Sequence, residues 1–326
     1  MNILVPLNNL DHLDRLLRSG ANEFYMGFNS DTWSTGFSEF DDLNRMSGFE
    51  RAANRYSMEE MPGCIQRIHE CGALIYITFN AAFYSEEQHR FVAKQFDALK
   101  EADADGVIVS DPILIRAATN RGLFAVASTM CGIYNTDVAR YYIGEGAKRI
   151  ILPRDISLSN IKEITATFPD TEFEVFLMRS GCKFADCYCL GFHRLPHGAF
   201  CENIRRSTCS IGGTGDSFSL RQTVSLNEIC YQSLFENGAC GLCALYRLLQ
   251  MNVRAGKIVG RAEHYESVLR DIKIVKNNLE IAEQCQSESE YLARMNMPEH
   301  RDTLCFSGAS CYYPDVRFDR VMPLKE

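Results

Sequence analysis

Cysteine is crowded into one stretch of this chain. The 326 residues include 14 Cys, and eight of them fall between Cys182 and Cys243. The sequence begins without the basic and apolar regions of a secretory signal, so we expect the cytoplasm, where stable disulfides are rare. Crowded thiols in a cytoplasmic protein are typical of metal or cluster ligation. This stretch is therefore the first candidate for a chemical site.

Two kinds of metal centre use ligands that are all cysteine. Four thiolates can hold a structural Zn²⁺, and four can hold an iron–sulfur cluster. Cys240-Gly-Leu-Cys243 is a C-x-x-C pair that suits either centre, and no second C-x-x-C is present. The lack of a second pair argues against a simple zinc ribbon, but the spacing of the thiols leaves both centres open.

The composition is that of a folded soluble protein. Hydrophobic residues make up 46% of the chain and charged residues 23%, which are ordinary values. The net charge of −8 argues against generic nucleic-acid binding. No apolar run approaches the roughly 20 residues of a membrane span. The H-E-x-x-H motif of zinc peptidases is also absent from the sequence.

Short β-branched or aromatic runs alternate with segments of helical period. Eight such alternations predict parallel βαβ units, and they favour a (β/α)8 TIM-like barrel, with an open doubly wound sheet as the alternative. We expect the barrel over 1–283, including a Cys-rich insertion at 179–241 after the seventh strand, and a short C-terminal appendage at 284–326. The predicted strands are Ile3–Pro6, Glu23–Phe28, Ala73–Phe79, Gly106–Ser110, Leu123–Ser128, Arg149–Pro153, Phe173–Met178 and Lys257–Gly260.

The barrel topology predicts where the thiols lie. A loop that follows a strand lies at the C-terminal face of such a barrel, where active sites are found. Cys182 comes four residues after the seventh strand, and Cys240 and Cys243 open the next helix, whose N-terminus favours thiolates. Polar residues at other strand ends belong to the same face. Four of them are candidate catalytic residues: Asn80, Asp111, Arg154 and Arg261.

Six segments match, in order, the motifs of a known family. They are Gly20-Ala-Asn-Glu-Phe-Tyr-Met-Gly27, Phe49-Glu-Arg-Ala-Ala-Asn-Arg-Tyr-Ser57, Tyr76-Ile-Thr-Phe-Asn80, Gly146-Ala-Lys-Arg-Ile-Ile-Leu-Pro-Arg-Asp155, Glu174-Val-Phe-Leu-Met-Arg-Ser-Gly-Cys182 and Lys257-Ile-Val-Gly-Arg261. With these motifs the chain resembles peptidase family U32, the collagenase-like peptidases of unknown mechanism. The resemblance covers about residues 1–283.

The resemblance implies a cofactor and an activity. Several members of the family are oxygen-independent hydroxylation factors, which act in ubiquinone biosynthesis or on tRNA and rRNA bases. The ubiquinone members are nearest to this chain in size. Such members carry a 4Fe–4S cluster on four Cys, and prephenate is implicated as the oxygen donor for some. Other members are named as collagenases. By position, the implied ligands are Cys182, Cys189, Cys201 and Cys240, with Cys187, Cys230 and Cys243 as alternates.

Four family positions at the predicted active face differ in this chain. The family His is Met178, the family Gly is Arg179, the family Glu is Val259 and the family Gln is Met130. The leading expectation is an iron–sulfur-dependent factor for oxygen-independent hydroxylation, or a related modification, of a small molecule or an RNA base. One alternative is a metal-dependent, collagenase-like peptidase. Another is a non-catalytic, cluster-bearing subunit that pairs with an active paralogous subunit.

Overall fold

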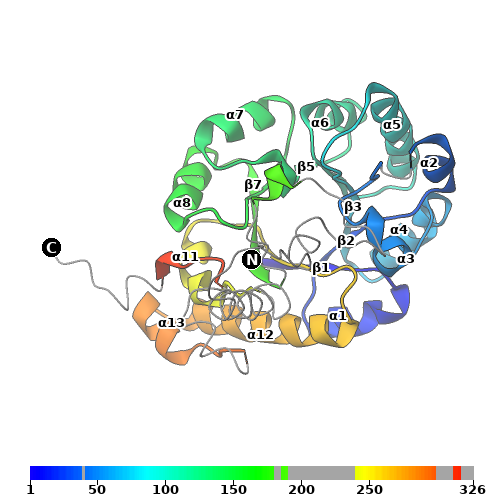
Figure 1. The fold of residues 1–326 in the computed structure, drawn as a ribbon. Helices are drawn as coiled ribbons and strands as arrows, with labels where there is room; N and C mark the ends of the chain where they lie inside the picture. Colours follow the sequence, from blue (N-terminus) through cyan, green and yellow to red (C-terminus); the bar gives the residue numbers. More distant parts are fainter. Residues whose placement is uncertain (39–40, 180–184, 190–238, 299–310, 317–326) are drawn as a thin grey trace, which may run out of the picture.

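Eight parallel strands close into a barrel in the computed structural model, which describes residues 1–38, 41–179, 185–189, 239–298 and 311–316 (Figure 1). Each strand pairs with the next along the chain, and β8 pairs with β1 to complete the closure. The predicted (β/α)8 barrel is therefore confirmed, and the open sheet is excluded. The strands are β1 (Asn2–Pro6), β2 (Glu23–Met26), β3 (Leu74–Phe79), β4 (Gly106–Val109), β5 (Ala125–Ala127), β6 (Arg149–Ile151), β7 (Glu172–Met178) and β8 (Ala255–Ile258).

Helices form an outer ring around the strands (Figure 1). They are α1 (Leu13–Ser19), α2 (Asp31–Gly36), α3 (Glu50–Ala53), α4 (Met61–His69), α5 (Glu86–Glu101), α6 (Pro112–Thr119), α7 (Thr136–Gly144), α8 (Leu158–Thr167), α11 (Leu245–Gln250), α12 (Tyr265–Gln284) and α13 (Glu288–Arg294). Short 3-10 turns include η4 (Thr129–Cys131), η5 (Asp186–Tyr188) and η6 (Leu242–Ala244). Within the described ranges, no helix is long and apolar enough to cross a bilayer.

Side chains that accept backbone N–H groups set the starts of several helices. The Ser85 hydroxyl accepts the N–H of Gln88 at the start of α5, and the Gln88 side chain accepts the N–H of Ser85 in return. Asn135 caps α7 and Ser157 caps α8 in a similar way. Each such cap stabilises a helix by about 1 kcal/mol. The caps therefore fix where the loops after the strands turn into helices.

The connection between β2 and β3 contains two short helices before α4. They are α2 and α3. Ser30 caps α2, and the buried Trp33 on that helix donates its indole N–H to the carbonyl of Asp41 at 2.9 Å. Helices of one or two turns show too few repeats for a periodic pattern, so the sequence did not reveal them.

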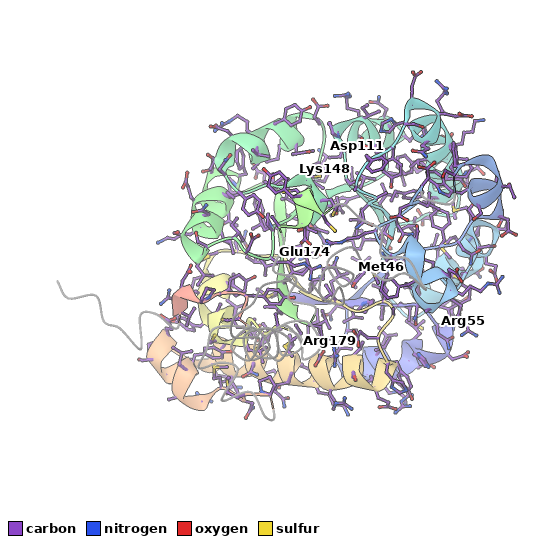
Figure 2. All side chains as sticks on the ribbon, viewed as in Figure 1. Met46, Arg55, Asp111, Lys148, Glu174 and Arg179 are labelled. Atoms are coloured by element: carbon purple, nitrogen blue, oxygen red, sulfur yellow. The ribbon has the colours of Figure 1, made fainter. Side chains whose placement is uncertain are left out.

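A layer of charge lies inside the otherwise apolar barrel. Its buried members are Glu23, Arg149, Glu174 and Lys257, and the partly exposed Glu172 borders them at the start of β7; we call these five residues the interior charged layer. Arg149 donates to Glu23 at 2.5 Å and pairs with Glu172 at 2.6 Å, while Lys257 donates to Glu174 at 2.8 Å. Glu174 lies near the centre of the barrel in Figure 2. Charges buried this deeply persist because they pair with one another.

The Cys-rich insertion leaves the barrel and rejoins it at one point. The N–H of Arg179 donates to the carbonyl of Ala239, and the N–H of Gly241 donates to the carbonyl of Leu177, both at 2.8 Å. Met178 faces Cys240 in an antiparallel bridge. Residues 179 and 239 are therefore neighbours at the end of β7, although residues 180–238 lie between them in sequence.

The described part of the predicted appendage packs onto the barrel. Tyr291 of α13 is buried and donates its hydroxyl to the carbonyl of Leu242 at 2.6 Å. Farther along the chain, Cys311 pairs with Cys240 in a parallel bridge, and the Tyr313 hydroxyl donates to the carbonyl of Phe176 at 2.9 Å. The segment 311–316 thus adds to the C-terminal face beside β7.

Candidate active site at the barrel mouth

One buried carboxylate gathers two arginines at the mouth of the barrel, the opening at the C-terminal ends of the strands. Asp186, in η5, is 2% exposed. It accepts hydrogen bonds from Arg45, from Arg154 Nε at 2.9 Å and from Thr129 Oγ1 at 2.8 Å. Burial alone would raise the pKa of the carboxyl, but Arg154 and Arg45 outweigh it and hold this pKa well below its usual range. We call Asp186, Arg45, Arg154 and Thr129 the mouth network.

Arg154 was predicted from its place at a strand end, and the structure puts it in the mouth network. It follows β6, and its guanidinium carbon lies 4.3 Å from the centre of the Phe176 ring. A guanidinium over an aromatic face gains a cation–π attraction. The ring and the Asp186 carboxylate together fix the orientation of Arg154. The sequence did not point to Asp186 itself, because the residue lies in an irregular loop with no periodic pattern.

Asn80, also predicted, supports the network from the end of β3. Its Oδ1 accepts the backbone N–H of Arg45 at 3.3 Å, and its Nδ2 donates to Ser128 Oγ at 3.4 Å. Asn80 therefore links the long β2–β3 connection, which carries Arg45, to the loop after β5. These contacts give it a positioning role at the mouth. Its predicted catalytic role remains a prediction.

Arg261, predicted from the end of β8, is a buried cation held by neutral oxygens. Its Nη1 donates to Thr78 Oγ1 at 2.8 Å, and its Nη2 donates to Asn44 Oδ1 at 3.1 Å. Burial lowers its pKa to about 10, so the side chain stays charged at neutral pH. Within the described ranges, no carboxylate lies within ion-pair distance of Arg261. The side chain can therefore offer its charge to an anionic group of a ligand.

Gly27 explains part of the first family motif. A Cβ at this position would lie 2.1 Å from Arg261 Nη1 and 2.1 Å from Asn54 Oδ1. No side chain fits there while the guanidinium keeps its place. The glycine at the end of β2 is therefore required by the close approach of Arg261 to the backbone.

Asp111, the fourth predicted catalytic residue, is engaged elsewhere. Its Oδ1 accepts the N–H of Leu114 as the cap of α6, and its Oδ2 lies 2.8 Å from His89 Nε2. Both contacts join it to the start of α6 and to α5 rather than to the arginines of the mouth network. The structure thus gives Asp111 a capping role.

The structure describes two of the four predicted metal ligands. Cys240 is 5% exposed and lies opposite Met178 at the end of β7. Cys189 follows η5, and its N–H donates to the carbonyl of Asp186 at 3.1 Å. Both therefore lie at the C-terminal face, as predicted. Cys182 and Cys201 lie outside the described residues, as does the alternate Cys230.

The other two alternates are described. Cys187 packs against Gly132, where a Cβ would lie 3.0 Å from the thiol sulfur, and Cys243 is half-buried in η6. In the part of the chain that the structure describes, no group of three or more His, Cys, Asp or Glu side chains is arranged to hold a metal ion. The four-cysteine ligand set remains a prediction.

Three of the family departures lie at the ends of β7 and β8. Met178 and Val259, in place of the family His and Glu, are both buried. Arg179, in place of the family Gly, has a φ of +69°. This is the left-handed region that glycine adopts without strain. The backbone conformation therefore explains why the family has Gly at this position. Arg179 forms ion pairs with Asp271 and Glu263, which attach the start of the insertion to α12 and the segment before it.

A cavity of about 470 Å³ opens beside this site in the β2–β3 connection. Phe28, Trp33, Asp41, Glu50 and Asn54 are among its lining residues. Its Asn54 also accepts from Arg261 at 3.4 Å, so the cavity borders the mouth. Sequence reasoning missed it because it is formed by the short helices that carry no periodic pattern.

Comparison with known proteins identifies relatives of two kinds. A Methanocaldococcus jannaschii protein named as an uncharacterized protease is 26% identical over 290 residues, which are 85% of this chain and 65% of that protein. The tRNA hydroxylation protein P of Helicobacter pylori is 27% identical over 207 residues, 62% of this chain and 45% of that protein. The tRNA hydroxylation protein P1 of Bacillus subtilis is 22% identical over 327 residues, covering 95% of this chain and 72% of that protein.

This chain spans less than two thirds of the length of the archaeal and Helicobacter relatives. The sequence profile of peptidase family U32 matches residues 8–313. That match includes the barrel from α1 and β2 through β8, the Cys-rich insertion and the first residues of the 311–316 segment. The chain belongs to peptidase family U32.

Proposed function

We propose that this chain is a factor for oxygen-independent hydroxylation, which acts on an RNA base or a small molecule and depends on a 4Fe–4S cluster. Two of its relatives are named as tRNA hydroxylation proteins, which supports a hydroxylation-related role. The hydroxyl oxygen then comes from a donor other than O₂. The cluster ligands in this proposal are Cys182, Cys189, Cys201 and Cys240.

The observation that carries the proposal is the placement of thiols beside arginines at the barrel mouth. Cys189 directly follows η5, whose Asp186 binds Arg154. Cys240 lies at the end of β7, one strand away from the loop that carries Arg154. An all-thiolate donor set fits an iron–sulfur cluster, and such a cluster supplies one-electron transfer when it is bound.

The protein side chains in this proposal bind and orient the substrate. Arg261 presents a charge that no described carboxylate neutralises, and it suits a carboxylate or phosphate of the substrate. Met178 and Val259 replace two family side chains that can transfer protons, so the ends of β7 and β8 carry buried apolar side chains at these positions instead. We therefore assign proton transfer to the substrate, its donor or a partner, and not to β7 or β8.

The first test is the metal content of the full chain purified without oxygen. About four Fe and four sulfide per chain, with absorbance near 400 nm, are expected for the cluster. Stoichiometric Zn without that absorbance would overturn the cluster and favour a thiolate-zinc centre. The second test compares tRNA and rRNA nucleosides and quinones, by mass spectrometry, from cells with and without the gene grown without oxygen. Loss of one hydroxylated species is the expected result.

The peptidase alternative rests on the family name and on the name of the archaeal relative. Chelator-sensitive cleavage of gelatin by the pure protein would promote it. A third outcome defines a subunit role. If the cluster-loaded chain acts only after a paralogous protein of the same family is added, the chain is the cluster-bearing partner in a hetero-oligomer.

A further inference from the structure

We propose that Asp186 is a positioning residue for the metal centre: its carboxylate fixes the segment 185–189 to the barrel mouth and so sets the place of Cys189. This inference rests on the proposed function, because it concerns a predicted cluster ligand. Asp186 lies between the predicted ligands Cys182 and Cys189 in sequence, and nothing in the sequence or in the relatives' names assigns it a role.

The carboxylate is held by donors from three separate loops. Arg45 belongs to the β2–β3 connection, Thr129 follows β5, and Arg154 follows β6. Such a three-way attachment restricts translation and rotation of η5 together. Because charge-assisted hydrogen bonds are about twice as strong as neutral ones, these contacts provide the main polar attachment of η5 to the barrel.

The attachment reaches the thiols through a very short piece of chain. The Asp186 carbonyl accepts the N–H of Cys189 at 3.1 Å, so the turn of η5 closes on the residue that carries the ligand. On the same turn, the Cys187 sulfur packs against Gly132, whose φ is +63°. A side chain at position 132 would displace Cys187. The first two residues of η5 are therefore held against the barrel, and the hydrogen bond from Cys189 to Asp186 limits how far Cys189 can move independently of Asp186.

The charge of Asp186 also acts on the centre directly. Replacing the carboxylate with an amide removes one negative charge and leaves Arg45 and Arg154 without that counter-charge. The loss of this negative charge makes the surroundings of Cys189 more positive. A more positive environment stabilises the reduced form of a cluster, because reduction adds an electron. A residue that only stabilised the fold would not change this potential in the molecules that still hold the metal.

The test compares Asp186→Asn with Asp137→Asn in the full chain, purified without oxygen. Asp137 is a suitable control because it is an exposed carboxylate on α7 that accepts a hydrogen bond from Arg140 Nη1 at 2.6 Å. The measurements are the rate of iron loss to an excess of chelator and the cluster reduction potential by electron paramagnetic resonance titration. We expect Asp186→Asn to lose iron about tenfold faster and to shift the potential upward, while Asp137→Asn matches the wild type.

Thr129→Val is the second variant, for the case in which Asp186→Asn does not fold. It removes one hydrogen bond to the carboxylate and no charge, so iron loss should accelerate two- to fivefold with no change in potential. A wild-type chain without iron or sulfide would overturn the proposed function. A wild type that holds the cluster, with variants at Asp186 and Thr129 that match it in iron loss and potential, would overturn only the positioning role.

Discussion

The interior charged layer and the mouth network both pair basic side chains with carboxylates, but they do so in different surroundings. Inside the barrel, the charges come from strand residues, and the Arg149 guanidinium carbon lies 4.8 Å from the centre of the Tyr76 ring. At the mouth, the charges come from loops between strands, and the Arg45 and Arg154 side chains keep 10% and 12% exposure. Apart from Glu172, the interior layer is buried among the strands, whereas the mouth network lies at the open C-terminal face.

The balance of charge differs as well. In the interior layer, three carboxylates surround Arg149 and Lys257. At the mouth, the described residues place one carboxylate, Asp186, with two arginines, and Arg261 adds a third cation nearby. The difference indicates that the interior layer stabilises the barrel. Among the described residues, the mouth network itself holds two arginines and one carboxylate.

The largest effect on stability should come from breaking the interior layer. Arg149→Met leaves Glu23 buried without its strongest partner, and removing one member of a buried pair costs about 3–5 kcal/mol. Urea unfolding measures the loss. Arg140→Met is the matched control, because Arg140 and Asp137 form an exposed pair, which contributes about 0–1 kcal/mol. Equal losses in both variants would contradict a stabilising role for the interior layer.

The largest effect on function should come from Arg261. Arg261→Met removes the charge and the hydrogen bonds to Thr78 and Asn44, and we expect at least ~100-fold less hydroxylated product, in the range seen when a positioned donor is lost. Stability should fall by only about 1–3 kcal/mol. Arg261→Lys keeps the charge but lacks the planar guanidinium, so its product yield should lie between those of the wild type and Arg261→Met. Full activity of Arg261→Met would remove Arg261 from the site.

The smallest substitution at Gly27 should test the same role of Arg261. Gly27→Ala places a Cβ 2.1 Å from the Arg261 guanidinium, so the arginine must move, with a stability cost of about 1–3 kcal/mol. Product formation should fall as in the Arg261 variants. Gly63→Ala in α4 is the control, since its Cβ meets no atom within 4 Å, and alanine in a helix should stabilise the chain by about 0.5–1 kcal/mol. Unfolding and product measurements on both variants decide the matter.

The smallest effect should come from protonation of Asp186, and it should be visible only at acidic pH. Arg154 and Arg45 depress the pKa of Asp186 below its unfolded value of about 3.9. Its stabilising contribution is therefore present above about pH 4 and is lost as the pH falls toward the folded-state value. Proteolysis of the native protein between pH 5 and 2 should show faster cleavage near residues 185–189 in acid. Asp186→Asn should cleave faster already at pH 5 and change less with pH.

Much of the barrel could be predicted because its signals are local and repeated. Every predicted strand is present with small shifts at its ends, and the rule that strand ends share one face placed Arg154, Asn80 and Arg261 at the mouth. The same rule could not predict that Asp111 caps α6, because capping and catalysis use the same residue type at the same position. The folded contacts to Leu114 and His89 show the cap, and the catalytic role of Asp111 stays a prediction.

The missed residues belong to segments without regular repeats. Arg45 and Asn44 lie in the β2–β3 connection, and Asp186 lies in the insertion. Their partners are distant in sequence: 141 residues separate Arg45 from Asp186, and 217 separate Asn44 from Arg261. Such contacts depend on the closed barrel, so no window along the sequence can contain both partners.

Because its two ends pair with each other, the Cys-rich insertion should be removable without opening the barrel. Arg179 and Ala239 share a backbone hydrogen bond at the end of β7. Closure of the barrel therefore does not depend on the length of the chain that joins these two residues. The entropy of closing a loop changes only slowly with its length. A short turn in place of 180–238 should therefore leave the eight strands in register. In this architecture, a lineage can exchange or discard the Cys-rich insertion while it inherits the same barrel scaffold.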